Sequence, residues 1–275
     1  MTKYPLPDNF SSDAAKHCAA LFIFNANIGR QPTENDLNAT ITFIEYKNKT
    51  YGITCKHVID IYKNKESFDK NTCFATLTNG THFIFNDFIL PPNDFFMLPE
   101  PDIAIRQICP DFPQIIGKIP IKLENNSINT LGKIQHAVAV GFPTKEKRPI
   151  DAKNGYRITM PCVHVLAKIS SINKDSGQLS LYSELDHTVQ IKDFSGMSGG
   201  PVFWSTEKDY GLLGIMYEAL PPNPSENSLG ESPRIVIKAE LVTSERFKNW
   251  VAKFPELSED KHWIKKIKCN FNINP

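Results

Sequence analysis

Apolar and polar residues alternate in short runs along most of the chain up to residue 242. Alternation with a period of two turns one face of a segment toward a core and the other toward solvent, as in a half-buried β-strand. Alternating runs at 39–46 and 49–54, and an apolar run rich in strand-forming residues at 19–24, predict strands. Further candidate strands are residues 72–77, 82–85, 136–141, 163–167, 178–182, 201–204, 212–217 and 234–238. Many short strands separated by turns favour an all-β barrel or sandwich.

Turn-forming residues separate these strands. Lys47-Asn48 and Asn79-Gly80 each stand between two alternating runs, and they predict tight hairpin turns. Three longer polar or proline-rich stretches are expected to be loops: residues 91–101, 143–156 and 220–233. Loops of this length in a compact domain often carry function.

Helical periodicity is concentrated near the end of the chain. Ser244 is a predicted N-cap, because the apolar residues after it repeat at the spacing of one helix face. Those residues are Phe247, Trp250, Val251 and Phe254. A second amphipathic stretch follows from Ser258, and residues 13–18 predict a short helix near the N-terminus.

The composition narrows the class of protein. With a net charge of +1, the 275-residue chain has no basic field for nucleic acid. No apolar run approaches the roughly 20 residues of a membrane-spanning helix, and the first residues lack the pattern of a signal peptide. The six cysteines form no CxxC pair, so we expect reduced thiols in a cytoplasmic protein. Because neither Cys55 with His57 nor Cys162 with His164 has zinc-site spacing, we expect no metal and no cofactor.

A glycine-rich segment carries the strongest chemical signal. It reads Gly196-x-Ser198-Gly199-Gly200-Pro201 and continues into a predicted strand. A nucleophilic serine needs an exposed hydroxyl on a tight bend and unhindered backbone N–H groups that can hold a developing oxyanion. Glycine permits both, so Ser198 is a candidate nucleophile, and the N–H groups of Gly196 and Ser198 are a candidate oxyanion hole.

Two further residues complete a candidate catalytic set. His57 ends a predicted strand three residues after Thr54, where it can serve as a general base. Asp102 begins the apolar run Asp102-Ile-Ala-Ile, and a carboxylate beside an apolar strand is costly to bury without a partner. A histidine N–H would be such a partner, and its pairing with the carboxylate would fix the histidine tautomer.

The order histidine, aspartate, serine resembles that of the trypsin/chymotrypsin-like serine protease family. The matching stretches are Thr54-x-x-His57-Val58, Asp102-Ile-Ala and Gly196-x-Ser198-Gly-Gly-Pro. The details are most similar to the bacterial HtrA-type branch, because Val58 replaces the disulfide cysteine of animal trypsins. Val138-Ala-Val-Gly141-Phe-Pro143 also resembles a strand end of that branch. The resemblance covers about residues 15–255.

The family implies a double antiparallel six-stranded β-barrel with a C-terminal α-helix and an active site between the barrels. The first barrel would span residues 15–125 and carry His57 and Asp102, and the second would span 132–242 and carry Ser198. A helical segment would follow in 243–275. The resemblance implies an endopeptidase in which Ser198 attacks, His57 transfers the proton, Asp102 orients His57, and the N–H groups of Gly196 and Ser198 hold the oxyanion.

The resemblance also places a substrate pocket. Lys192 at its base would favour acidic substrate residues, whereas Phe194 and Met216 together with Tyr217 would favour small apolar ones. The residues leave both preferences open. By the same resemblance, the strand that carries Gly214, Ile215 and Met216 would pair with the substrate backbone.

Departures from the family suggest how the protein is controlled. Met197 replaces the aspartate that pairs with a new N-terminus in animal zymogens, so activation by N-terminal insertion is not expected. We expect no PDZ domain after the terminal helix. Uncontrolled proteolysis would harm a cell, so we expect a latent enzyme acting on protein or peptide substrates and opened by a partner protein. The resemblance suggests such partners for small cytoplasmic bacterial members of the family.

Two other functions compete with a protease. The same fold can be catalytically silent and serve as a binding or regulatory module. An α/β-hydrolase esterase would need its serine between a strand and a helix, with the histidine after the serine. Here His57 precedes Ser198 and a predicted strand follows the serine, so the esterase is disfavoured.

Overall fold

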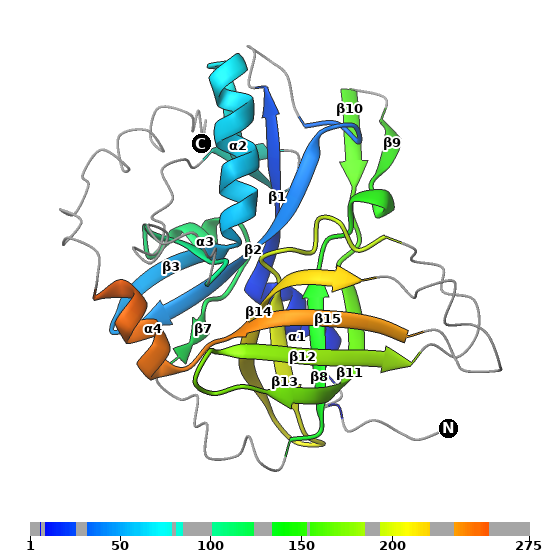
Figure 1. Ribbon diagram of the computed structural model, residues 1–275. Helices are drawn as coiled ribbons and strands as arrows, with labels where there is room; N and C mark the ends of the chain where they lie inside the picture. The colour runs from blue at the N-terminus through cyan, green and yellow to red at the C-terminus, as the bar shows by residue number, and fades with distance from the viewer. Residues whose placement is uncertain are drawn as a thin grey trace.

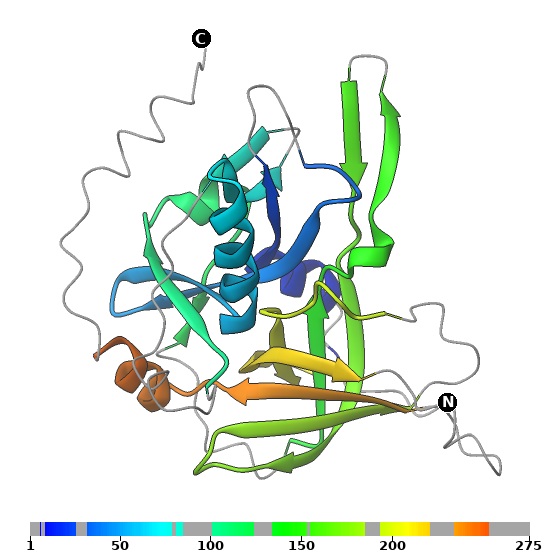
Figure 2. The ribbon, with the colours of Figure 1, turned by 45° about the horizontal axis from the view of Figure 1, so that its top comes forward.

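The structure is a computed structural model that describes residues 6, 9–25, 32–78, 81–84, 101–123, 134–152, 155–184, 193–220 and 234–252. Strands dominate it, as the alternating pattern predicts (Figure 1). An N-terminal sheet and a C-terminal barrel lie one above the other in Figure 2, with helix α2 (Lys56–Phe68) beside the sheet. No helix among these residues is long and apolar enough to cross a membrane.

The N-terminal sheet has seven strands in the order β5-β4-β1-β2-β3-β6, with β7 paired to β2. Its strands are β1 (Cys18–Asn25), β2 (Leu37–Tyr46), β3 (Lys49–Thr54), β4 (Thr72–Thr78), β5 (Thr81–Ile84), β6 (Ala104–Ile108) and β7 (Ile121–Lys122). Lys47 and Asn48 form the predicted tight turn between β2 and β3, and both have positive φ angles. The expected closure into a six-stranded barrel is not recorded among the described residues of this half.

The C-terminal barrel is closed and has six antiparallel strands in the order β11-β12-β15-β14-β13-β8. Its strands are β8 (His136–Gly141), β11 (Val163–Ile172), β12 (Gln178–Glu184), β13 (Pro201–Ser205), β14 (Tyr210–Leu220) and β15 (Arg234–Leu241). This is the arrangement that the family resemblance implies for the second half of the chain. The expected boundary at 125–132 lies outside the described residues, so the division into two domains stays a prediction.

Buried apolar residues of the described ranges form four clusters, of which the smallest comprises Phe22, Phe24, Cys73 and Ala75 of β1 and β4. The other three are larger. One lies against the N-terminal sheet and α2, and a second fills the C-terminal barrel. A third draws buried residues from both halves, among them Ile53 and Ile105 of the sheet and Val140 and Ile215 of the barrel. Buried apolar area is the main stabilising contribution to such a core. The two halves therefore share a core, and the surfaces that meet there can position side chains against each other.

Helix α2 is the largest departure from the sequence prediction. Strand β3 ends at Thr54, and His57 lies in the first turn of α2 instead of at a strand end. Val58, Ile59 and Tyr62 are the buried residues of this helix. They pack on the N-terminal sheet, and this packing makes the helix favourable although its other residues are mostly polar.

The other helices are short: α1 (Phe10–Ala14), η1 (Ala15–His17), α3 (Phe112–Ile115), η5 (Thr144–Glu146) and α4 (Ser244–Val251). The N-cap of α4 is Thr243, whose side chain accepts a hydrogen bond from the Arg246 N–H, and not the predicted Ser244. The Ser244 hydroxyl instead donates to Leu123 O at 2.8 Å. Phe247 and Trp250 are buried as predicted, whereas Phe254 and the stretch after Ser258 lie outside the described residues.

A two-stranded hairpin occupies part of a predicted loop. Strands β9 (Arg148–Ala152) and β10 (Gly155–Thr159) pair antiparallel and extend away from the barrel (Figures 1 and 2). The sequence did not predict this hairpin, because its strands contain proline and charged residues in place of a regular apolar alternation. The predicted loops at 91–100 and 221–233 lie outside the described residues.

Candidate active site

His57 and Asp102 form the best-defined pair of the site. Asp102 lies just before β6, and its Oδ2 is 2.6 Å from His57 Nδ1. Its other oxygen accepts the backbone N–H of His57 at 3.0 Å, at the start of α2. The His57 side chain is 42% exposed and that of Asp102 is 19% exposed, so the imidazole can meet a substrate while the carboxylate lies behind it.

The Cys55 thiol lies beneath this pair. Its Sγ donates to Met216 O at 3.2 Å and is wholly buried. The ligand atoms of Cys55, His57 and Asp102 all lie within 4.8 Å of one another, a spacing that a metal ion could bridge. Burial, followed by the nearby Asp102 carboxylate, raises the pKa of Cys55 well above its usual range. With no metal bound, this environment favours a neutral thiol, whose S–H donates to Met216 O.

Ser198 lies in a turn in which two positions require glycine. Gly196 has a φ of +93° and Gly199 a φ of +89°, both in the region that residues with a Cβ rarely adopt. A Cβ at Gly199 would also overlap Thr40 O and Thr54 Oγ1 of the N-terminal sheet. The turn thus carries glycine because its backbone lies directly against strands β2 and β3.

Every backbone carbonyl of the turn from residue 195 to 200 accepts a hydrogen bond. Four of the donors are backbone N–H groups and two are threonine hydroxyls. The bonds are Thr144 N to Ser195 O, Thr40 Oγ1 to Gly196 O, Gly200 N to Met197 O, Thr40 N to Ser198 O, Thr42 Oγ1 to Gly199 O and Met216 N to Gly200 O. The turn is therefore fixed peptide by peptide.

The N–H groups of the same turn behave differently. Those of Ser195, Met197, Gly199 and Gly200 donate hydrogen bonds. Within the described part of the chain, those of Gly196 and Ser198 donate none. In a trans peptide the C=O and N–H point in opposite directions, so the bond from Thr144 N to Ser195 O turns the Gly196 N–H away from Thr144. Two unpaired N–H groups two residues apart in one turn can bind an anionic oxygen.

The Ser198 hydroxyl donates to Tyr217 O at 3.4 Å. No hydrogen bond to His57 Nε2 is present among the described residues. The hydroxyl is partly exposed and can leave this long contact by rotation about its Cα–Cβ bond. Catalytic hydrogen bonds are often loose without substrate, so the arrangement is compatible with a Ser–His pair.

The residues predicted to bind substrate differ in burial and in strand pairing. Phe194 and Met216 are buried in the barrel core, with 6% and 1% exposure. Gly214 and Ile215 pair with β13 on one side and β15 on the other, so their strand edges are occupied. Lys192 lies outside the described residues. Their roles in binding substrate stay predictions. The pairing of β13 with β14 ends at Ile215.

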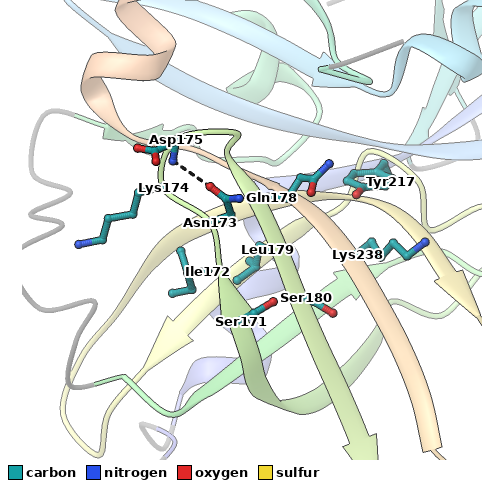
Figure 3. A pocket seen from close by; sticks show the side chains of 10 residues that line it. All are labelled: Ser171, Ile172, Asn173, Lys174, Asp175, Gln178, Leu179, Ser180, Tyr217 and Lys238. Atoms are coloured by element: carbon teal, nitrogen blue, oxygen red, sulfur yellow. Dashed lines mark hydrogen bonds between the residues drawn. The ribbon is translucent and has the colours of Figure 1, made fainter. Parts of the chain in front are cut away.

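A pocket of about 770 Å³ has Tyr217 of β14 in its lining. Figure 3 shows the hairpin that joins β11 and β12 on one side, with Tyr217 and Lys238 beside it. The lining is largely polar, and Lys238 forms an ion pair of 2.7 Å with Glu218. Tyr217 connects the pocket with the candidate nucleophile, because its carbonyl is the acceptor of the Ser198 hydroxyl.

Three buried threonines support the site, and the sequence analysis named only Thr54 among them. Thr40 and Thr42 of β2 bind carbonyls of the turn, and Thr54 donates to Thr40 O at 2.9 Å. All three are fully buried. Two threonines at alternate positions of an otherwise apolar strand were a usable signal, because a buried hydroxyl needs a partner.

Comparisons with known proteins find similar solved structures but no matching family. No protein-family model matches it, and no curated protein matches it. Matching solved structures include a thermostable serine protease AL20 from an extremophilic microorganism, at 12% identity, with a TM-score of 0.44 and coverage of 86% of this chain and 95% of that chain. They also include a structure on the coupled folding and binding of the Sesbania mosaic virus VPg protein, at 11% identity, with a TM-score of 0.42 and coverage of 87% and 92%. Matches of this strength assign neither an activity nor the HtrA-type branch.

Proposed function

We propose that the protein is a serine endopeptidase in which Ser198 is the nucleophile, His57 the general base and Asp102 the group that orients His57. The observation that carries the proposal is the turn from residue 195 to 200, in which all carbonyls are engaged. Among the N–H groups of this turn, only those of Gly196 and Ser198 donate no hydrogen bond to a described residue. A turn with this pattern binds the oxyanion of an acyl-transfer intermediate.

Attack by Ser198 is the first step of the proposed reaction. Asp102 accepts the Nδ1–H of His57, which leaves Nε2 of the neutral ring as a proton acceptor. The Ser198 Oγ–H proton moves to Nε2 while Oγ forms a bond to the substrate carbonyl carbon. The carbonyl oxygen becomes an oxyanion held by the N–H groups of Gly196 and Ser198. Asp102 stabilises the imidazolium that forms.

Breakdown completes the cycle. The C–N bond of the tetrahedral intermediate breaks, His57 returns its proton to the leaving amine, and an acyl-enzyme on Ser198 remains. Water then gives one proton to His57 and adds to the acyl carbon. Collapse releases the carboxylic acid, and the proton on His57 returns to Ser198.

The open part of β14 is the proposed binding edge for the substrate backbone. From Glu218 to Leu220 the strand pairs with β15, and no strand of the described residues pairs with its other edge. An extended peptide can add to such an edge as a further antiparallel strand. The pocket beside Tyr217 would then receive a substrate side chain away from the scissile bond.

A silent binding module is the second candidate. It is favoured by the hydrogen bond that the Ser198 hydroxyl makes to Tyr217 O instead of to His57. In that case β14 would still bind an extended segment, and Ser198 would not react.

Covalent labelling by a fluorophosphonate probe separates the two candidates. We expect the wild-type protein to be labelled and Ser198→Ala to remain unlabelled, because the probe reacts with an activated serine. Ser67→Ala is the matched control, since Ser67 is an exposed serine near the far end of α2. Labelling that persists in Ser198→Ala would contradict the assigned nucleophile, and an unlabelled wild type would favour the binding module.

The engaged carbonyls support a turn that is already arranged for catalysis. Any latency would then arise outside this turn, for example by covering of the strand edge at β14. Latency, an activating partner protein and a bacterial cytoplasmic setting remain predictions, which the labelling of purified wild type begins to test.

A further inference from the structure

Thr40 of β2 contacts the candidate catalytic turn at two points. Its backbone N–H donates to Ser198 O at 2.9 Å, and its hydroxyl donates to Gly196 O at 2.8 Å. The hydroxyl also accepts the N–H of Phe142 at 3.2 Å. Because the side chain has 0% exposure, water cannot substitute for any of these partners. One residue of the N-terminal sheet thus holds the carbonyls on both sides of the candidate oxyanion hole.

We propose that the Thr40 hydroxyl is a positioning group that keeps the oxyanion hole in its working form. This inference rests on the proposed function, and it names a residue that would keep the oxyanion donors in place. Thr40 does not touch the reacting atoms. It acts through Gly196, whose N–H is one of the two proposed oxyanion donors.

The reason lies in the freedom of a glycine at this position. Gly196 has no side chain to hold it, and its φ of +93° is one of several conformations that glycine adopts at similar energy. The peptide on its N-terminal side is fixed by the bond from Thr144 N to Ser195 O. The carbonyl of the peptide on its C-terminal side is held by the Thr40 hydroxyl, and the N–H of that peptide, from Met197, donates to Phe194 O. Without that hydroxyl the buried Gly196 carbonyl would lack a partner, and the turn would gain by rotating to find one.

The neighbouring residue cannot replace this contact. Met197 is fully buried in the core of the C-terminal barrel and has no charge with which to form an ion pair. Its side chain packs beside Gly141 at the end of β8. The side chain of Met197 therefore adds packing only, its N–H donates to Phe194 O, and the hydrogen bond to the Gly196 carbonyl comes from Thr40.

Substitution of Thr40 in the full chain tests the inference. Thr40→Val keeps the shape and removes the hydroxyl, whereas Thr40→Ser keeps the hydroxyl. We expect the rate of fluorophosphonate labelling to fall about 10- to 100-fold in Thr40→Val, less than or comparable to the loss of one oxyanion donor. Thr40→Ser should restore most of the rate. With a peptide substrate the loss should appear in kcat with little change in KM, because ground-state contacts are kept.

Thr76→Val is the matched control for a buried hydroxyl. Thr76 lies in β4 of the same sheet, is also fully buried, and has a hydroxyl without a hydrogen-bond partner in the described part of the chain. Its substitution should leave the labelling rate unchanged. A Thr40→Val protein that is folded by circular dichroism and labelled as fast as wild type would overturn the inference.

A second measurement covers the other outcomes. If Thr40→Val does not fold, a crystal structure of the wild-type phosphonate adduct tests the positioning role of Thr40. A Gly196 carbonyl still bonded to Thr40 Oγ1 would support that role, and a carbonyl that has left Thr40 Oγ1 would overturn it. If wild type is not labelled at all, the proposed function fails by itself. The structure of Thr40→Val then decides about Thr40, because a displaced Gly196 carbonyl supports the positioning role and an unmoved one contradicts it.

Discussion

The histidine side and the serine side of the candidate site are held by different contacts. His57 is fixed within the N-terminal half, by the two oxygens of Asp102 on its ring and its backbone N–H. The turn of Ser198 belongs to the C-terminal barrel, yet three of its carbonyl bonds come from Thr40 and Thr42 of β2. The base is therefore assembled locally, whereas the oxyanion donors depend on the junction of the two halves.

This difference separates two kinds of failure. A change on the histidine side should alter proton transfer and leave the fold intact. A change on the serine side should weaken the contact between the halves and the chemistry together, because the same hydrogen bonds serve both.

The largest expected effect is on the histidine side. Asp102→Asn keeps an oxygen for the His57 backbone N–H but turns an amide group toward the ring, which favours the wrong tautomer. We expect the labelling rate to fall about 10⁴-fold, equivalent to about 5.5 kcal/mol, with an unchanged melting temperature. Asp111→Asn, at an exposed aspartate, is the control and should have no effect. An Asp102→Asn protein with normal labelling would exclude the pair from catalysis.

The next largest effect breaks the serine side. Gly199→Ala places a Cβ against Thr40 O and Thr54 Oγ1 at a φ of +89°. We expect the free energy of unfolding to fall by about 2–5 kcal/mol, the sum of overpacking and left-handed strain. Urea unfolding measures it. Gly117→Ala is the control, because Gly117 has a φ of +70° with nothing within 4 Å of the added Cβ. It should lose only about 1–2 kcal/mol, and equal losses would refute the close contact.

The smallest expected effect concerns the junction of the two halves. Nδ1 of His17 is 2.7 Å from Ile119 O, and Nε2 is 3.3 Å from the hydroxyl of Tyr210 in the barrel. Burial lowers the pKa of His17 below 6.5, although the hydrogen bond to Ile119 O and the Asp13 carboxylate oppose this shift in part and Lys16 and Lys118 reinforce it. The unfolded chain therefore binds more protons below about pH 6.5, so this contribution to stability is complete above that pH and falls as the pH drops.

Urea unfolding at pH 7.5 and pH 5.5 tests this contribution. Wild type should lose more stability on acidification than His17→Gln, which cannot take up the proton. If both proteins lose the same free energy of unfolding, His17 does not weaken the junction in acid.

Much of the fold follows from local patterns. Alternating apolar residues predict the strands of both halves, and Lys47-Asn48 forms the expected turn because both residues tolerate positive φ. Helix α2 was missed because its helical signal is confined to Val58, Ile59 and Tyr62, next to a strand of similar apolar character. Its stability comes from packing on the sheet, which a local pattern does not contain.

For the candidate site too, local motifs were predictable and tertiary contacts were not. The sequence identified Ser198, His57 and Asp102 by motif, and the structure brings the last two within hydrogen-bond distance. Their catalytic roles, and the substrate roles of Lys192 and Phe194, stay predictions. The sequence could indicate that a buried Thr40 hydroxyl needs a partner, but it could not indicate which partner, because the partners lie more than 100 residues away along the chain.

The hydrogen bonds between β2 and the turn of Ser198 have a consequence for biosynthesis. Strand β2 leaves the ribosome long before residue 196, so the template for the turn exists before the nucleophile is made. The C-terminal barrel made alone would contain Ser198 and its glycines but would lack Thr40 and Thr42. Reactivity should therefore appear only in the last stage of synthesis, when the new turn docks on the older strand. A cut that separates the two halves would end it without touching the nucleophile.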